Sequence, residues 1–153
     1  DTTAKLEDGA KLVLTERLLT HDAQTVESNV VIELEGEDSS VQIISRSVAQ
    51  DNSVQVFSPL VVGKAACRGH VQCDAILMDE AEVHAIPALD AKTKDAELIH
   101  EAAIGKIAGA QLLKLMSLGL SEEEAEEKAY TLFDDGSDFD YVTEITETYK
   151  DES

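Results

Sequence analysis

The 153-residue chain carries 32 acidic and 12 basic side chains, which gives a formal net charge of −20. That charge repels nucleic acids and anionic membranes, so we expect neither as a partner. Aromatic residues make up only 4% and tryptophan is absent, so a chain of this length predicts one domain with an aliphatic core. No apolar run approaches the roughly 20 residues that cross a bilayer.

Cysteine usage predicts a reducing compartment. The two cysteines, Cys67 and Cys73, are six residues apart, and a disulfide that closes so short a loop would stabilise little. With no secretory signal pattern at the start, we expect a cytoplasmic protein with free thiols. The chain begins with Asp1 and not with methionine, so we expect a processed product or a fragment.

The first two thirds of the chain read as short strands. Residues 11–15 alternate like a strand that 18–19 could continue, and His21 follows in a polar turn. Further β-rich runs lie at 29–34, 41–45, 53–57, 60–62, 71–77, 82–86 and 96–100, with Pro59 between the fourth and fifth of them. Many short strands with polar breaks predict a sandwich, a barrel or a β-helix.

The choice among these folds depends on repeats and turns. The pair Val-Gln opens a run at positions 41, 54 and 71, a loose repeat with spacings of 13 and 17 residues. Asn-Gly and Asp-Gly, the dipeptides typical of hairpin turns, are nearly absent from this region. We therefore favour stacked coils over hairpins.

After Gly105 the pattern becomes helical. Leucines and a methionine cluster over 109–118, and Gly119 is placed to end that helix. Ser121 with Glu124 three residues later predicts a capping box that starts another helix. Residues 121–153 hold 13 acidic and 2 basic side chains, which we interpret as a solvated helix face and a weakly ordered tail.

Candidate ligands gather between residues 64 and 105, which contain both cysteines together with His70, His84 and His100. The spacing of Cys67, His70 and Cys73 resembles a metal site, but no C-x-x-C or H-x-x-H pair supports a tetrahedral zinc centre. Two thiolates are also too few for an iron–sulfur cluster without other ligands or a second chain. No phosphate loop, nucleophile elbow or zinc-protease helix is present, so nothing predicts a hydrolase.

Strand alternation refines this set. Cys73 shares a predicted apolar face with Val71, which is typical of a small buried thiol. His100 and Glu101 are adjacent and point to opposite faces of a regular strand, so at most one of them faces Cys73. Cys67 and His70 lie around a glycine, which predicts an exposed loop.

A series of motifs then points to one family. They are Cys73-Asp-Ala-Ile-Leu-Met78, His84-Ala-Ile-Pro87, His100-Glu-Ala-Ala-Ile-Gly105, Gln111-Leu-Leu and Ser117-Leu-Gly-Leu-Ser-Glu-Glu-Glu-Ala125. In this order they resemble the C-terminal part of the SufB/SufD family, the scaffold of SUF iron–sulfur cluster assembly. The resemblance implies a mainly β chain, a right-handed parallel β-helix closed by C-terminal α-helices.

The resemblance also implies organisation and partners. Residues 1–105 would form the β-helix core, 106–135 a helical segment that docks the ABC-type ATPase SufC, and 136–153 an acidic tail. Scaffold subunits of the family pair, so a second SufB/SufD-like subunit or a homodimer is expected. The partner-binding residues would be Gln111, Leu112, Leu115, Met116, Leu118 and Ala125.

Site residues follow by position. Cys73 matches the cysteine tied to the nascent cluster, Glu101 a carboxylate beside it, and His100 a histidine at the subunit interface. His84 matches the histidine before the proline, whereas Cys67 and His70 are candidates on local chemistry alone. The implied cargo is a transient iron–sulfur cluster, with sharing between subunits as one arrangement.

Departures from the family also matter. Family members have a longer N-terminal portion, Ile99 stands where SufB-like members often carry Glu, and Leu118 stands where Arg is usual. We expect a non-catalytic scaffold. The alternatives are a zinc-binding or metal-storing module that uses Cys67, His70 and Cys73, and a cluster-free interaction module of SufD type with inert cysteines.

Overall fold

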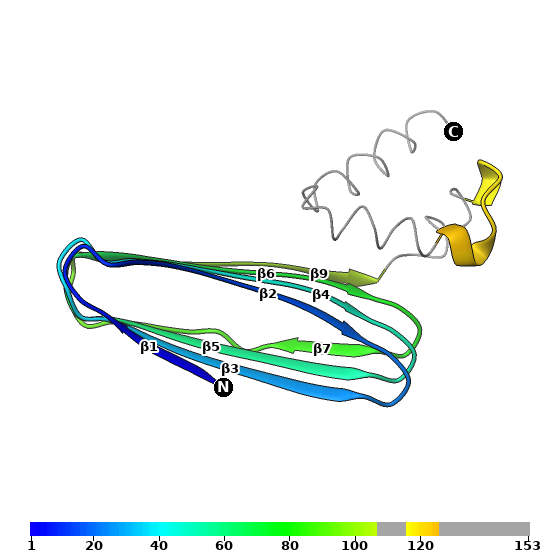
Figure 1. Cartoon of the computed structure of the whole chain (residues 1–153), viewed down its shortest axis with the longest axis horizontal. Helices are drawn as coiled ribbons and strands as arrows, with labels where there is room; N and C mark the ends of the chain where they lie inside the picture. Colours follow the sequence, from blue (N-terminus) through cyan, green and yellow to red (C-terminus); the bar gives the residue numbers. More distant parts are fainter. Residues whose placement is uncertain (107–115, 126–153) are drawn as a thin grey trace. The chain divides into compact units, whose positions relative to one another are not determined.

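The computed structural model describes residues 1–106 and 116–125, and contacts divide the chain into two compact units, Asp1–Ile104 and Gly105–Ser153. The described strands are β1 (Thr2–Leu6), β2 (Lys11–Thr20), β3 (Thr25–Leu34), β4 (Ser40–Ala49), β5 (Val54–Gly63), β6 (Cys67–Leu77), β7 (Glu82–Ala85), β8 (Ala88–Ala91) and β9 (Ala96–Lys106). Figure 1 shows these strands stacked in two layers.

Successive strands alternate between two parallel sheets. One sheet has the order β1-β3-β5-β7 with β8 also paired to β5, and the other has the order β2-β4-β6-β9. Each coil of the chain therefore lays one strand in each sheet before the next coil stacks on it. This is a parallel β-helix of four coils, which confirms the predicted stacked coils and excludes the sandwich and the barrel.

The length of a coil follows from the strand register. Thr2 pairs with Val30 and Lys11 with Ser40, so equivalent positions are 28 or 29 residues apart. The Val-Gln repeat does not follow this period. Val41 pairs with Gly69, two positions before Val71, and Val54 lies in the other sheet. The interpretation of that pair as the coil repeat was wrong.

Pro59 does not break a strand, contrary to the two separate runs predicted around it. It lies within β5, where the neighbouring strand is itself interrupted: β7 pairs with Val54–Phe57, and β8 pairs with Leu60–Gly63. Pro87 occupies the gap between β7 and β8. A missing amide donor is tolerated at this point because the ladder to the next coil is already open.

One corner of the β-helix is a column of aspartates. Asp22, Asp51 and Asp79 occupy equivalent turns and all have left-handed backbone conformations, with φ of 53°, 57° and 56°. The amide of Asp22 donates to Oδ2 of Asp51 at 2.8 Å, and the amide of Asp51 donates to Oδ2 of Asp79 at 3.2 Å. Aspartate suits this corner because it tolerates the conformation and also accepts a hydrogen bond from the previous coil. His21 lies exposed beside this corner, as predicted.

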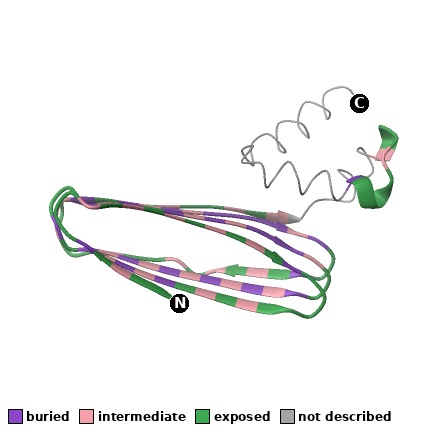
Figure 2. Ribbon diagram, in the orientation of Figure 1, coloured by how far each residue is buried: buried purple, intermediate pink, exposed green. Residues whose placement is uncertain are grey.

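The core between the sheets is aliphatic, as the composition predicts. Buried and more exposed residues alternate along the strands of both sheets (Figure 2). The most deeply buried side chains include Ile32, Leu34, Ile43, Val61 and Val71, each 0% exposed. The period of two therefore assigns one face of each strand to the core.

The second unit is described over residues 116–125. Gly119 has φ of 96° and donates its amide to the carbonyl of Met116, which confirms the predicted helix end. Ser121 and Glu124 form the predicted capping box, with hydrogen bonds of 2.8 and 3.1 Å that lower the pKa of Glu124. The helical prediction for 109–115 and the predictions for 126–153 lie outside the described residues. Across the described ranges, no helix is long and apolar enough to span a membrane.

Candidate functional site

Both cysteines lie on β6, and this corrects the prediction of an exposed loop. Cys67 is buried on the inward face, 3% exposed, while His70 points outward and is half-buried. The glycine between them belongs to the strand because its small size is needed there. A Cβ atom on Gly69 would lie 2.8 Å from Cδ2 of Leu98 in the next coil.

The strand geometry separates these three candidate ligands. A strand rises about 3.3 Å per residue, so six residues place Cys67 and Cys73 roughly 20 Å apart. His70 lies on the opposite face of the sheet from both thiols. The three side chains cannot bind one ion, and the zinc module built on them is excluded. Over residues 1–106 and 116–125, no group of three His, Cys, Asp or Glu side chains is arranged around one metal position.

Cys73 is the more deeply placed thiol, at 1% exposed in the centre of β6. Burial raises the pKa of Cys73 to about 11, with further contributions from the charges of Asp74 and Glu16. The protein therefore holds this side chain as a neutral thiol at physiological pH. Cys67 differs in that it lines a polar cavity with Lys11, Asp38 and Arg68, although burial also raises its pKa.

His100 shares the interior with Cys73. It lies on β9, the neighbour of β6, and alternation turns His100 and Leu98 inward while Ile99 and Glu101 are exposed. This confirms that only one of His100 and Glu101 faces the thiol. Nε2 of His100 is buried and has no hydrogen-bond partner. An orphaned buried nitrogen is rare in proteins and marks a position for a ligand.

The remaining candidates lie elsewhere. Glu101 is on the outward face of the same sheet, where its Oε2 lies 3.1 Å from Nε2 of His70. His84 is exposed on β7 in the other sheet, and its Nε2 lies 3.0 Å from Oε2 of Glu82. The six candidates thus do not form one cluster; Cys73 and His100 are the pair that the fold turns into the lumen together.

The sequence reasoning missed Glu16, a carboxylate inside the β-helix. Its Oε2 accepts a hydrogen bond from Oγ of Ser28 at 2.6 Å, and its Oε1 accepts one from Oγ of Ser45 at 2.7 Å. The signal was present in the alternation of 12–18, where Glu16 takes an inward position between leucines. A charged residue in an otherwise apolar inward row marks a polar feature of the core.

The predicted partner-binding residues are described only in part. Met116 is half-buried, Leu118 is 66% exposed and Ala125 is fully buried. Gln111, Leu112 and Leu115 lie outside the described residues.

Comparison with known proteins decides the family. The model of the SufBD core domain, described as SUF system FeS cluster assembly, matches residues 2–128. The chain belongs to the SufBD family. An iron-sulfur cluster assembly SufBD family protein of Archaeoglobus fulgidus is 34% identical over 124 residues, which are 80% of this chain and 34% of the relative.

Other SufBD relatives agree. The protein of Methanocaldococcus jannaschii is 37% identical over 115 residues, 74% of this chain and 36% of the relative. A protein of Pyrococcus horikoshii is 44% identical over 94 residues, 60% of this chain and 21% of the relative. The chain therefore spans about a third or less of the length of these SufBD relatives. Family membership and the parallel β-helix together confirm the resemblance found in the sequence.

Proposed function

We propose that this SufBD chain is a non-catalytic scaffold that holds a nascent iron–sulfur cluster at Cys73 and His100 in the cytoplasm. The observation that supports this most directly is the buried, unpartnered Nε2 of His100 on the strand beside Cys73. Thiolate and imidazole are ligands that iron accepts. The cluster is the cargo of the scaffold and not a resident cofactor.

The incomplete ligand set suits a cargo that must leave. One thiol and one imidazole leave iron positions that other ligands must fill, and mixed ligation should hold a cluster less firmly than four thiolates. The thiol of Cys73 loses its proton when sulfur binds iron. The high pKa of Cys73 makes the metal a requirement for that ionisation.

Glu101 enters this proposal through a second chain. Cys73 and Glu101 lie on opposite faces of one sheet, so a single chain cannot easily bring both to one iron. We assign Glu101 to a cluster shared with a second SufBD-like subunit or with a homodimer partner. The segment 106–135 is the proposed docking site for the SufC ATPase, with exposed Leu118 among its contacts.

Anaerobic reconstitution with iron and sulfide tests the scaffold role. Visible absorbance and native mass are read for the wild type and for Cys73→Ser and His100→Ala, each alone and with the SufC ATPase. Cys67→Ala and His84→Ala are the matched controls, because these side chains lie away from the proposed site. We expect both site variants to lose most of the cluster and both controls to keep it. Equal retention in Cys73→Ser would reject the cluster site.

A second candidate is a cluster-free interaction module of SufD type, favoured by the burial of both cysteines. In that case reconstitution yields no cluster under any condition, while the complex with the ATPase or with a second SufBD-like subunit still forms. Native mass of the mixture separates this outcome from an inactive preparation.

A further inference from the structure

The lumen beside Cys73 contains a fixed negative charge. Glu16 pairs with Ser45 across β2 and β4, and Ser45 pairs with Cys73 across β4 and β6. The three residues are consecutive rungs of one inward column. Neighbouring strands are about 4.8 Å apart, so Glu16 lies roughly 10 Å from Cys73 at the backbone.

The carboxylate of Glu16 is held in place from both sheets. Ser45 donates from the same sheet, and Ser28 donates across the lumen from β3. Hydrogen bonds to a carboxylate are short and strong, and two of them fix its position. The structure thus retains the charge in the interior.

That charge is not balanced by a nearby base. Within residues 1–106 and 116–125, no Lys, Arg or His side chain lies within ion-pair distance of Glu16. Of the other ionisable groups around Cys73, Asp74 points to the outer side, 4.0 Å from Nε of Arg46, and His100 is a neutral or cationic ligand on β9. The field that Glu16 places on the lumen is therefore negative.

We propose that Glu16 is a positioning residue of the Cys73 site, whose fixed charge raises the affinity of that site for a divalent metal ion. The inference rests on the proposed function of Cys73 and extends it to the order of loading. A negative lumen attracts a cation and repels an anionic sulfur species such as hydrosulfide. The metal ion therefore binds before the sulfide does.

Cobalt(II) binding to the full chain tests this, because its thiolate bond is read directly by charge-transfer absorbance without any cluster. All variants carry Cys67→Ala, so Cys73 is the remaining thiol. We expect Glu16→Gln to weaken cobalt binding roughly tenfold to a hundredfold, the effect of one charge at this distance in a partly polar interior. Glu16→Asp keeps the charge and should stay within about threefold of the parent.

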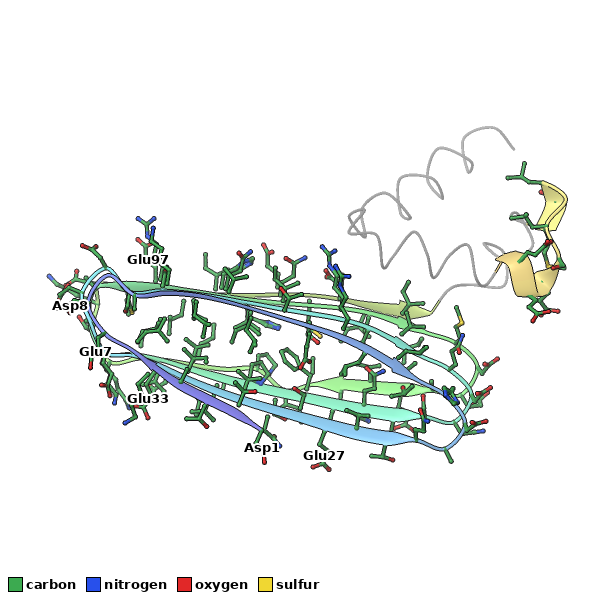
Figure 3. All side chains as sticks on the ribbon, in the orientation of Figure 1. Asp1, Glu7, Asp8, Glu27, Glu33 and Glu97 are labelled. Carbon is green, nitrogen blue, oxygen red and sulfur yellow. The ribbon has the colours of Figure 1, made fainter. Side chains whose placement is uncertain are left out.

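Two controls separate charge from structure. Glu27→Gln makes the same charge change on the outer face of β3, where Glu27 points away from the coils (Figure 3), and should change the affinity less than twofold. Ser28→Ala removes one hydrogen bond but keeps the carboxylate, and should remain close to the parent. High salt should abolish any effect of Glu27→Gln and leave that of Glu16→Gln largely intact, since buried charges are screened less.

The outcomes are distinct. Equal affinities in Glu16→Gln and Glu27→Gln would overturn the role of Glu16. An equal loss in Ser28→Ala would assign the effect to packing and would also overturn it. Cobalt absorbance that persists in Cys73→Ser would instead reject the proposed site itself, whatever Glu16 does.

Discussion

Nε2 of His70 lies 3.1 Å from Oε2 of Glu101, and this contact joins β6 to β9 on the outer face of the sheet whose inner face carries Cys73. The Glu101 side chain is 65% exposed and that of His70 is 33% exposed. The outer pair and the inner thiol are therefore separated by the sheet itself. Effects at one side can be tested without unfolding the other.

Glu101→Gln should leave the fold almost unchanged. An exposed pair of this kind contributes little, so we expect the free energy of unfolding to change by less than about 0.5 kcal/mol. Urea unfolding followed by circular dichroism measures it, with His70→Ala as the matched variant. A loss above about 1.5 kcal/mol in either variant would show that the pair supports the β-helix, and cluster loss in Glu101→Gln could then not be assigned to a missing ligand.

Cys73 should react slowly with alkylating reagents, and faster as the pH rises. With a pKa of about 11, the thiolate fraction at pH 8 is roughly two orders of magnitude below that of an ordinary cysteine. The rate should increase about tenfold per pH unit and level off near pH 11. Iodoacetamide labelling of the Cys67→Ala variant, followed by mass, gives the profile. A plateau below pH 9 would contradict the buried, neutral thiol.

The raised pKa of Cys73 also predicts a loss of stability at high pH. The folded state disfavours the thiolate, so the contribution is complete below the unfolded pKa of about 9 and disappears as the pH rises towards 11. A shift of this size corresponds to roughly 1–3 kcal/mol. Cys73→Ala should flatten this part of the stability profile. Urea midpoints between pH 8 and pH 11 test it, and parallel curves for both proteins would refute the assignment.

The aspartate corner should distinguish backbone strain from lost hydrogen bonds. Asp51 has φ of 57°, accepts the amide of Asp22 and donates its own amide to Asp79. Asp51→Asn keeps the acceptor and tolerates the conformation, so it should cost less than about 0.5 kcal/mol. Asp51→Gly loses only the acceptor, whereas Asp51→Ala loses both features and should cost about 1–2 kcal/mol. Thermal unfolding should rank the variants in that order; an alanine variant as stable as the asparagine variant would contradict it.

Gly69→Ala should weaken the packing of the coil that carries His100 on the coil that carries Cys73. The added Cβ would lie 2.8 Å from Cδ2 of Leu98 and 3.1 Å from Cγ1 of Val61. We expect a cost of about 1–3 kcal/mol, typical of an overpacked core. Gly105→Ala is the control, because no atom lies within 4 Å of the added Cβ. Equal melting temperatures for the two variants would show that Leu98 moves aside at no cost.

Local patterns predicted what local chemistry decides. The period of two along β9 separated His100 from Glu101 correctly, and the spacing of Ser121 and Glu124 predicted their reciprocal hydrogen bonds. Both depend on residues within one element. The aliphatic core followed from composition for the same reason, since it needs no knowledge of which strands meet.

Contacts between coils were out of reach of the same reasoning. Gly69 suggested a loop because nothing nearby in sequence shows that Leu98 fills its space. Glu16 is held by Ser28 and Ser45, 12 and 29 residues away. The coil length itself is a property of the pairing, so a dipeptide that recurred at other spacings gave the wrong period. Whatever is decided one coil away needs the register.

The stacking order of the sheet has a consequence for hydrogen exchange. β6 is bonded on both sides, to β4 and β9, whereas β9 ends the order of its sheet within the described residues. In a stack of coils, the terminal coil opens first because it has lost one neighbour. Amides of β9 should therefore exchange sooner than those of β6. The imidazole of His100 can then peel away while the thiol strand stays closed, so the lumen has a door that opens without unfolding the rest.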